Sequence, residues 1–197
     1  MTTIVAVKKD GLACIAADTL TSFGDLRLSA ASSENKRKIL PVGDSFLGLS
    51  GSSAHIIVLE SYFASPKAPR RFRSRREVFE TWRKLHRSLK DQYFLNPKDE
   101  DSDPYESTQL TALMATPHGL YGVFSLREVF EFSRFWAMGS GREFALGALQ
   151  ALYERLPTAQ AIAEAAVAAA CEFDKSSALP LESFLVKQRG KSVKPRS

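Results

Sequence analysis

The spacing of hydrophobic and polar residues changes in blocks along the chain, and each block predicts one kind of secondary structure. Near the N-terminus, β-branched and small residues alternate, and the turn Lys9-Asp10-Gly11 divides the apolar positions into a hairpin. A polar, irregular segment follows over 19–35, and a second hairpin is expected around Val42-Gly43-Asp44. The strands predicted in this first block are 2–8, 12–17, 36–41 and 45–50.

Helical spacing begins near Gly51, where Gly51-Ser52-Ser53 offers an N-cap and apolar residues then recur every three or four positions until Pro66. Ser74-Arg75-Arg76-Glu77 has the form of a capping box and predicts the start of a second helix. The acidic, polar stretch 96–107 predicts a long exposed loop. The remaining predicted elements are strands at 109–116, 120–125 and 132–138, helices at 142–155 and 159–173, and a last strand at 181–187.

Strands and helices therefore come in separate blocks: strands, two helices, strands, two helices and one strand. This order argues against a doubly wound parallel sheet, in which strands and helices alternate. Two antiparallel sheets packed between two pairs of helices would bury the apolar face of every helix. We therefore predict an α+β fold, a four-layer αββα sandwich, in a single domain over 2–187 that is followed by a basic C-terminal tail over 188–197.

The composition is that of a soluble globular protein and narrows the classes of partner. Of the 197 residues, 44% are hydrophobic and 25% are charged, and no apolar run approaches the roughly 20 residues that a membrane helix needs. The N-terminus lacks the pattern of a signal peptide, so we expect a cytoplasmic protein with no membrane partner. The net charge of +5 is concentrated in 70–76 and in the tail from Lys187. Basic patches are more often solvated faces, and nucleic-acid binding is therefore not expected.

The cysteines and histidines give no sign of a metal or a cofactor. Cys14 and Cys171 lie among apolar residues and in no CxxC pattern, which favours two buried, inert thiols. The three histidines do not have the spacing of metal ligands. We therefore expect neither a cofactor nor a metal site.

The residue after Met1 is the first candidate for chemistry. Initiator methionine is usually removed when the next side chain is small, and removal would give Thr2 a hydroxyl and a free α-amine together. The ordinary pKa of an α-amine is about 7.7–8.0, so part of it is neutral at cellular pH and can act as a base for the threonine hydroxyl. The alternative is that Met-Thr-Thr merely begins a strand, and Thr2 alone does not decide between the two.

Six short motifs follow one another along the chain: 2–7 (Thr-Thr-Ile-Val-Ala-Val), 15–18 (Ile-Ala-Ala-Asp), Lys36-Arg37-Lys38-Ile39-Leu40, Gly48-Leu49-Ser50-Gly51, Met138-Gly139-Ser140-Gly141 and Asp174-Lys175-Ser176-Ser177. In their order and spacing, which span 2–187, they resemble the proteasome β-type subunits and the HslV peptidase family, and they are most similar to the bacterial proteasome homologues. Arg142, Ala178-Leu179 and the loop 96–107 depart from the family's pattern.

The resemblance implies that Thr2 is the nucleophile and that a buried ion pair serves it. Asp18 ends an apolar strand, where a carboxylate is unfavourable unless it is paired. In the family the matching aspartate pairs with a lysine close to the threonine hydroxyl, and Lys36 is expected to take that place. Counting back from Gly51 favours Lys36. Counting forward from Asp18 leaves about two residues more than HslV has, which makes Lys38 the alternative on the same strand face.

The other site residues also come from the resemblance. The residues that match those around the threonine amine are Ser140, Asp174 and Ser177. Gly51 matches the glycine whose N–H faces the developing oxyanion. Ser22 is expected to lie where backbone groups hold an extended peptide as an added strand, and Leu49 to line the pocket for an apolar side chain before the cut.

The fold that the resemblance implies is the N-terminal-nucleophile sandwich, in agreement with the block order. The implied function is a threonine-type endopeptidase of peptides or unfolded proteins, built as a homo-oligomeric stacked double ring, with seven subunits favoured over six. The sequence leaves open whether an unfoldase is a partner. A proteolytically silent ring protein and a small-molecule amidohydrolase of the same fold are the alternatives. A nucleic-acid binder would show steep salt dependence.

Overall fold

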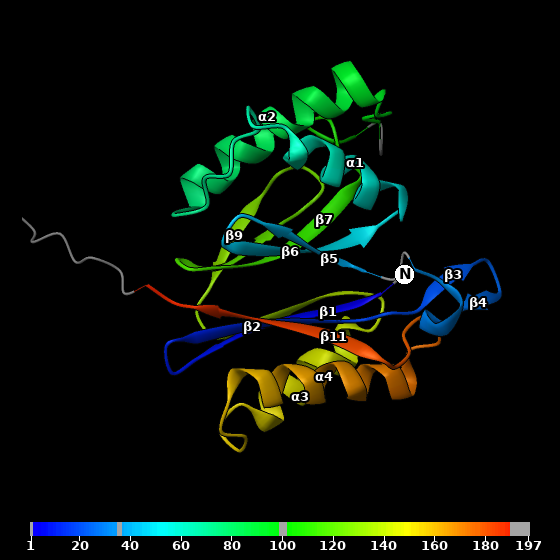
Figure 1. The fold of residues 1–197 in the computed structure, drawn as a ribbon, viewed down its shortest axis with the longest axis vertical. Helices are drawn as coiled ribbons and strands as arrows, with labels where there is room; N and C mark the ends of the chain where they lie inside the picture. Colours follow the sequence, from blue (N-terminus) through cyan, green and yellow to red (C-terminus); the bar gives the residue numbers. More distant parts are fainter. Residues whose placement is uncertain (1, 35–36, 99–101, 190–197) are drawn as a thin grey trace, which may run out of the picture.

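Two antiparallel sheets lie face to face in the computed structural model, which describes residues 2–34, 37–98 and 102–189 (Figure 1). The first sheet has the order β10-β1-β2-β11 and the second has the order β5-β6-β7-β8-β9. The strands of the first sheet are β1 (Thr3–Lys9), β2 (Leu12–Asp18), β10 (Phe135–Gly139) and β11 (Leu181–Lys187). Those of the second are β5 (Ile39–Val42), β6 (Ser45–Gly51), β7 (Leu110–Thr116), β8 (Gly119–Val123) and β9 (Val129–Phe132).

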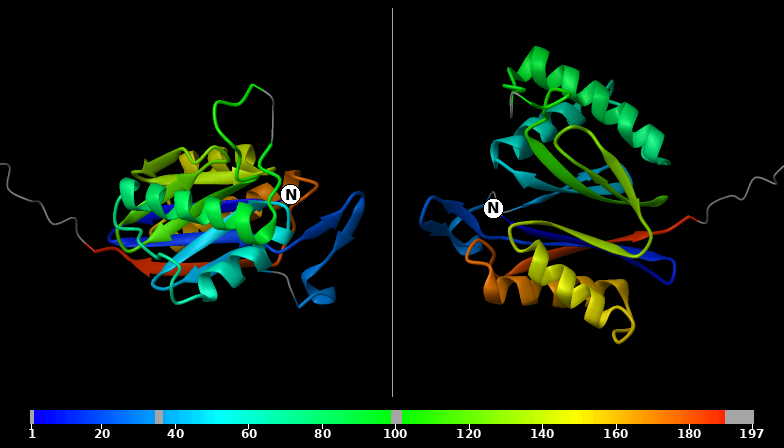
Figure 2. Two further views of the ribbon diagram at one scale, coloured as in Figure 1. Left: turned by 90° about the horizontal axis from the view of Figure 1, so that it is seen from above. Right: turned by 180° about the vertical axis from the view of Figure 1, so that it is seen from behind.

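A pair of helices covers the outer face of each sheet, as Figures 1 and 2 show. The helices on the second sheet are α1 (Ala54–Ala64) and α2 (Arg75–Tyr93), and those on the first are α3 (Arg142–Leu152) and α4 (Ala159–Phe173). The predicted cap of α2 is present, because the Glu77 N–H donates to Ser74 Oγ at 3.3 Å. No helix in the described part of the chain is long and apolar enough to cross a membrane. The predicted four-layer αββα sandwich is confirmed.

Apolar clusters fill the three spaces between the four layers. In β1, Ile4 and Ala6 face the second sheet, whereas Val5 and Val7 face α3 and α4. Because both faces of β1 are covered, all four side chains are fully buried. The apolar face of α2 packs against the second sheet and completes the third cluster. The first sheet is therefore packed with apolar side chains on both faces, and it supports the polar residues at the ends of its strands.

The structure contains two short strands that the sequence did not predict. The segment 19–35, predicted to be irregular, contains β3 (Thr21–Phe23) and β4 (Leu26–Leu28), which pair with each other, and a single turn of 3₁₀-helix at Ala30–Ser32. The strand predicted at 132–138 is two strands, β9 and β10, which belong to different sheets. Three-residue strands are too short to show an alternating pattern, so hydrophobic spacing could not find the hairpin.

The two cysteines differ in burial. Cys14 is buried in β2, as predicted, and burial raises the pKa of its thiol to about 12. Cys171 of α4 is only partly buried, so the prediction of full burial was wrong for this residue. Burial still raises the pKa of the Cys171 thiol to about 11. Both thiols are therefore protonated at neutral pH, and neither has the character of a nucleophile.

The first sheet brings residues from both ends of the chain to one edge. Thr3 of β1 lies opposite Gly139 of β10, and Asp18 of β2 lies opposite Leu181 of β11. The N-terminus reaches this edge between the two sheets, next to the β3–β4 hairpin (Figure 1). The motif residues of the first and last thirds of the sequence therefore come together in one place. Residues 190–197, most of the predicted basic tail, lie outside the described residues.

Candidate active site

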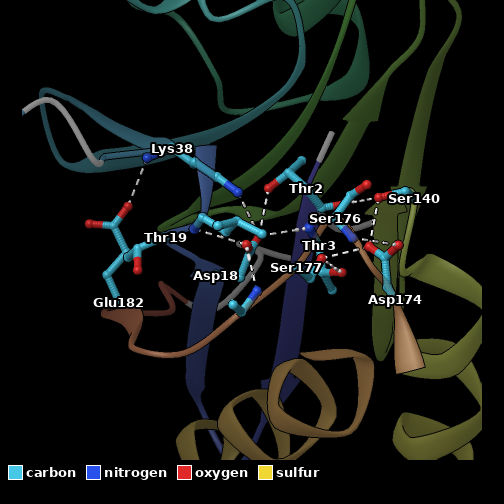
Figure 3. A network of polar contacts seen from close by, with 12 residues as sticks. Thr2, Thr3, Asp18, Thr19, Lys38, Ser140, Asp174, Ser176, Ser177 and Glu182 are labelled. Atoms are coloured by element: carbon cyan, nitrogen blue, oxygen red, sulfur yellow. Dashed lines mark hydrogen bonds and ion pairs between the residues drawn. The ribbon is translucent and has the colours of Figure 1, made fainter. Parts of the chain in front are cut away.

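A single buried carboxylate organises the polar groups at this edge (Figure 3). Asp18 is completely buried, and each of its oxygens accepts several hydrogen bonds. Oδ1 accepts from Thr2 Oγ1 at 2.8 Å, from the Thr3 N–H at 2.9 Å and from Lys38 Nζ at 2.7 Å. Oδ2 accepts from the Leu20 N–H at 3.1 Å and from the Ala178 N–H at 3.2 Å. Both oxygens are thus saturated, which is what makes a carboxylate tolerable in a dry interior.

Among the described residues, the lysine that pairs with Asp18 is Lys38, the alternative to Lys36, which the sequence favoured. The pairing of β5 with β6 decides this point: Ile39 lies opposite Gly48, and the Leu49 N–H donates to the Lys38 carbonyl at 3.0 Å. This register sends the side chain of Lys38 to Asp18. Lys36 lies outside the described residues. Counting back from Gly51 was misleading, because it placed the strand at 36–41, whereas β5 begins at Ile39 and Lys38 immediately precedes it.

Lys38 is a buried cation that shares its acceptor atom with Thr2. Only 9% of Lys38 is exposed. Burial lowers the pKa of its ammonium group, and the charge and hydrogen bond of Asp18 oppose this shift. Because Lys38 Nζ and Thr2 Oγ1 both donate to Asp18 Oδ1, the ammonium group lies beside the threonine hydroxyl. A cation in this position favours any negative charge that develops on that hydroxyl oxygen.

A second polar cluster holds the other side of the first strand. Thr3 Oγ1 lies 2.8 Å from Ser177 Oγ, and Ser177 and Ser140 each donate to Asp174 Oδ2 at 2.7 Å. A hydroxyl has only one proton, so Ser177, which donates to Asp174, accepts from Thr3. Ser140 Oγ is also 3.3 Å from the Thr2 carbonyl oxygen. The predicted residues Ser140, Asp174 and Ser177 therefore do come together, next to the backbone of Thr2.

The carboxylate of Asp174 stays ionised because of its neighbours. Partial burial raises its pKa, but the hydrogen bonds from Ser140 and Ser177 and from the Ser176 N–H outweigh burial and hold that pKa below the ordinary value of 3.8. Asp174 is therefore an anion at neutral pH. It adds a fixed negative charge on the Ser140 side of Thr2, opposite to the Lys38 side.

The glycine before Ser140 allows the two strands to meet. Gly139 has a φ of +95°, a value that disfavours other residues, and a Cβ there would overlap the Thr2 carbonyl. The close approach places Ser140 against the start of β1. The Gly-Ser-Gly sequence is thus required by the contact between β10 and Thr2, in addition to forming the turn into α3.

A cavity of about 910 Å³ opens beside Thr2. The residues of the prediction that line it are Thr2, Ser22, Leu49 and Gly51, and Lys38 lines it as well. Gly51 ends β6 with a φ of +140° and is exposed there. Leu49 is buried and supplies an apolar wall, and Ser22 lines the cavity from β3. Thr2 is thus reached from a space large enough for a peptide segment.

Three participants in this network were not anticipated from the sequence. Thr3 links β1 to Ser177, and the Ala178 N–H supplies a hydrogen bond to Asp18. Glu182 of β11 accepts hydrogen bonds from the backbone of the Lys38 segment. Thr3 could have been found, since strand alternation places it with Val5 and Val7 on a buried face where a hydroxyl needs a partner. The backbone N–H of Ala178 and the distant acceptor Glu182 could not have been found in this way, because no local sequence pattern reports a backbone donor or a contact between distant segments.

Comparison with known proteins gives both a family match and close structural relatives. The family model described as "Proteasome subunit" matches residues 1–182. The structure of BPH from Thiobacillus denitrificans is 42% identical in sequence, covers 95% of this chain and 99% of that chain, and superposes with a TM-score of 0.88. The same protein in complex with epoxomicin is 41% identical, with the same coverage and TM-score.

A more distant structure shares the fold. HslV from Trypanosoma brucei is 18% identical, covers 94% of this chain and 99% of that chain, and has a TM-score of 0.67. A search of curated proteins found no match.

The lowered pKa of Asp174 leads to a prediction about stability. A carboxylate with a depressed pKa stabilises the folded state fully above its ordinary value of 3.8, and this contribution is lost as the pH falls through the lower folded value. At about pH 5 to 7, Asp174→Asn should therefore lower the free energy of unfolding by about 1–2 kcal/mol, since hydrogen bonds to a charged group are lost. The difference from the wild type should shrink below pH 3.8.

Urea unfolding at a series of pH values measures this difference. Asp25→Asn, in the exposed turn of the β3–β4 hairpin, is the control and should change little at any pH. A deficit of Asp174→Asn that is the same at acid and neutral pH would contradict the assigned role of the charge.

Proposed function

The chain belongs to the proteasome subunit family, and we propose that it is a threonine-type peptidase that cuts peptide bonds with the hydroxyl of Thr2. One observation carries the proposal. Thr2 lines a cavity, and its hydroxyl donates to a fully buried aspartate that also binds a buried lysine. A threonine that only began a strand would not need such an ion pair at its side chain.

The proposed reaction begins once Met1 is removed and the Thr2 amine is free. The amine takes the proton of the Thr2 hydroxyl as the oxygen attacks the carbonyl carbon of the substrate. Lys38 favours the negative charge on the attacking oxygen, and Asp18 compensates the lysine. The Gly51 N–H donates to the oxyanion, an interaction that can change rates by about 10²–10³-fold. The amine then protonates the leaving nitrogen, and the C–N bond breaks to leave an ester on Thr2.

The second half of the proposed reaction returns the enzyme to its starting state. Water loses a proton to the amine and attacks the ester, the Thr2 oxygen regains a proton, and the acyl group leaves as a carboxylic acid. Ser140, Asp174 and Ser177 orient the amine, and the ionised Asp174 favours the protonated form of the amine when it arises. These steps use no metal and no cofactor.

The cavity supports an extended peptide as the substrate. Among the described strands, β3 pairs only with β4, so its other edge is available to hydrogen-bond a peptide beside Ser22. Leu49 supplies an apolar wall for the side chain before the cut. A series of peptides that differ only at this side chain tests the assignment. Faster cleavage after leucine than after aspartate is expected, and the reverse order would contradict it.

Subunits of this family generally form stacked rings, and we propose a homo-oligomeric double ring, seven-fold rather than six-fold, for this chain. Exposed aromatic side chains support an assembly. Phe144 of α3 and Phe173 of α4 touch with ring centroids 5.5 Å apart, yet they are 45% and 69% exposed. Apolar groups gathered in this way commonly mark contacts between proteins. We also propose a cytoplasmic location for this assembly.

Intact mass spectrometry with a β-lactone or vinyl-sulfone inhibitor tests the nucleophile. We expect a protein without Met1 that gains one adduct, and no adduct on Thr2→Ala, because the reactive hydroxyl is then gone. Thr3→Ala is the matched control and should still react, since Thr3 faces the second polar cluster. A protein that retains Met1 and gains no adduct would favour a proteolytically silent ring. A protein that reacts but cleaves only small amides would favour an amidohydrolase.

The assignment of the lysine makes a second prediction. Lys38→Ala should slow inactivation by the inhibitor by about 100-fold or more, because the charge beside the Thr2 hydroxyl is lost. Lys36→Ala should react at nearly the wild-type rate. Pseudo-first-order labelling rates, with circular dichroism to verify folding, decide between them. If Lys36→Ala were the slow variant, the register of β5 given above would be wrong.

The assembly makes a third prediction. Native mass spectrometry of the wild type should give a complex of fourteen chains if two seven-fold rings stack, about 14 × 21.8 kDa. Phe144→Ser combined with Phe173→Ser should shift the protein toward smaller species, because the exposed aromatic contact is removed. Lys84→Ser, an exposed change on α2, should leave the complex intact. A monomeric wild type would exclude the ring.

A further inference from the structure

The backbone that carries Lys38 lies outside any regular strand. Lys38 immediately precedes β5, and among the described residues its carbonyl joins the second sheet through the Leu49 N–H. The N–H groups of Lys38 and Ile39 bond to the first sheet instead. Both donate to one acceptor, Glu182 Oε1, at 2.9 and 3.2 Å. A single carboxylate oxygen therefore fixes two successive peptide groups at the point where the lysine leaves the backbone.

Glu182 belongs to the other sheet, next to the strand that carries Asp18. In the register of β11 with β2, Leu181 lies opposite Asp18 and Glu182 lies opposite Ala17. The Lys38 segment is therefore attached twice to the first sheet. Its side chain binds Asp18 of β2, and its backbone binds Glu182 of β11, as Figure 3 shows. Two attachments on neighbouring strands fix both the position and the direction of the lysine side chain.

The contact acts on the backbone and not on the ammonium group. Both groups that donate to Glu182 are peptide N–H groups, whereas the ammonium group of Lys38 donates to Asp18. Hydrogen bonds from a backbone N–H to a carboxylate are shorter and stronger than neutral ones, but a neutral amide oxygen can accept at the same place. An experiment can therefore separate the ability of the Glu182 side chain to accept hydrogen bonds from its negative charge.

We propose that Glu182 is a positioning residue, which holds the Lys38 segment against the first sheet so that the ammonium group reaches Asp18 beside Thr2. The proposal rests on the proposed function, since it assigns to Lys38 the role of serving the Thr2 hydroxyl. It extends that function to a residue of the last strand that touches neither the substrate nor the reacting atoms. Its essential element is the accepting oxygen of Glu182, and not the negative charge.

Two substitutions of similar length distinguish these properties. Glu182→Gln keeps an accepting oxygen and removes the charge, whereas Glu182→Met removes both. Labelling of Thr2 by the β-lactone should be within about 3-fold of the wild-type rate for Glu182→Gln and slower by about 10-fold or more for Glu182→Met. Slow labelling of both variants would overturn the backbone role in favour of charge, and wild-type rates for both would overturn the proposal altogether.

The double variant and the pH profile show whether the effect passes through Lys38. Glu182→Met added to Lys38→Met should slow labelling no further than Lys38→Met alone, because the two residues act as one unit. A nearby cation lowers the pKa of an amine, so loss of the correctly placed lysine should move the rising limb of the pH–rate profile to higher pH in Glu182→Met. Additive effects, or a slower rate with an unshifted profile, would show a merely structural role.

Hydrogen exchange tests the contact without relying on activity. The Lys38 and Ile39 amides should be protected in the wild type and in Glu182→Gln, and should exchange about 10-fold faster or more in Glu182→Met, while β1 and β2 amides stay unchanged. This measurement separates the two proposals. If the wild type gave no adduct, the proposed function would fail. The exchange data would still show whether Glu182 holds the Lys38 and Ile39 amides. Unchanged exchange in Glu182→Met would overturn the inference even in an active enzyme.

Discussion

The burial of one carboxylate is the constraint on which this structure depends. Asp18 has no exposed surface, so every one of its hydrogen bonds has to come from the protein. Apart from the nearby Leu20 N–H, the donors come from the first residues of the chain, from the segment before β5 and from the turn that follows Asp174. Meeting this one requirement fixes the relative positions of three segments that are far apart in sequence. The candidate site is the result.

Strand alternation divides the polar groups into two compartments. Thr2 and Thr3 are neighbours, but their hydroxyls point to opposite sides of the chain, one to Asp18 and the other to Ser177. A cation and its counter-ion lie on the first side, and an anion held by two serines lies on the second. The backbone of Thr2 lies between charges of opposite sign. An amine at that position would be oriented by the second side, while the hydroxyl is polarised by the first.

The sequence predicted the fold well where a helix or strand is long enough for its buried face to show as a regular spacing of apolar residues. The four helices and most strands of the two large sheets were found because their apolar faces repeat with clear periods. β9 and β10 were predicted as one strand, and β3 and β4 are too short to show a period. Within the site, Asp18, Ser140, Asp174 and Ser177 were found through motifs. The choice between Lys36 and Lys38 failed because it depends on a strand register, which no local pattern reports. Glu182 was missed for a similar reason, since its partners are backbone groups of another sheet.

The polar network joins residues near position 2 to residues near position 180, and this has a consequence for the order of synthesis. During synthesis Thr2 and Asp18 leave the ribosome long before Ala178 and β11, so Asp18 lacks one of its hydrogen-bond donors until residue 178 has emerged. Contacts so distant along the chain also slow folding, because the entropy of closing a long loop opposes them. For a chain that we propose to be a peptidase, unfinished copies would remain harmless to the other nascent proteins around them. The topology itself would delay the activity until β11 has been made.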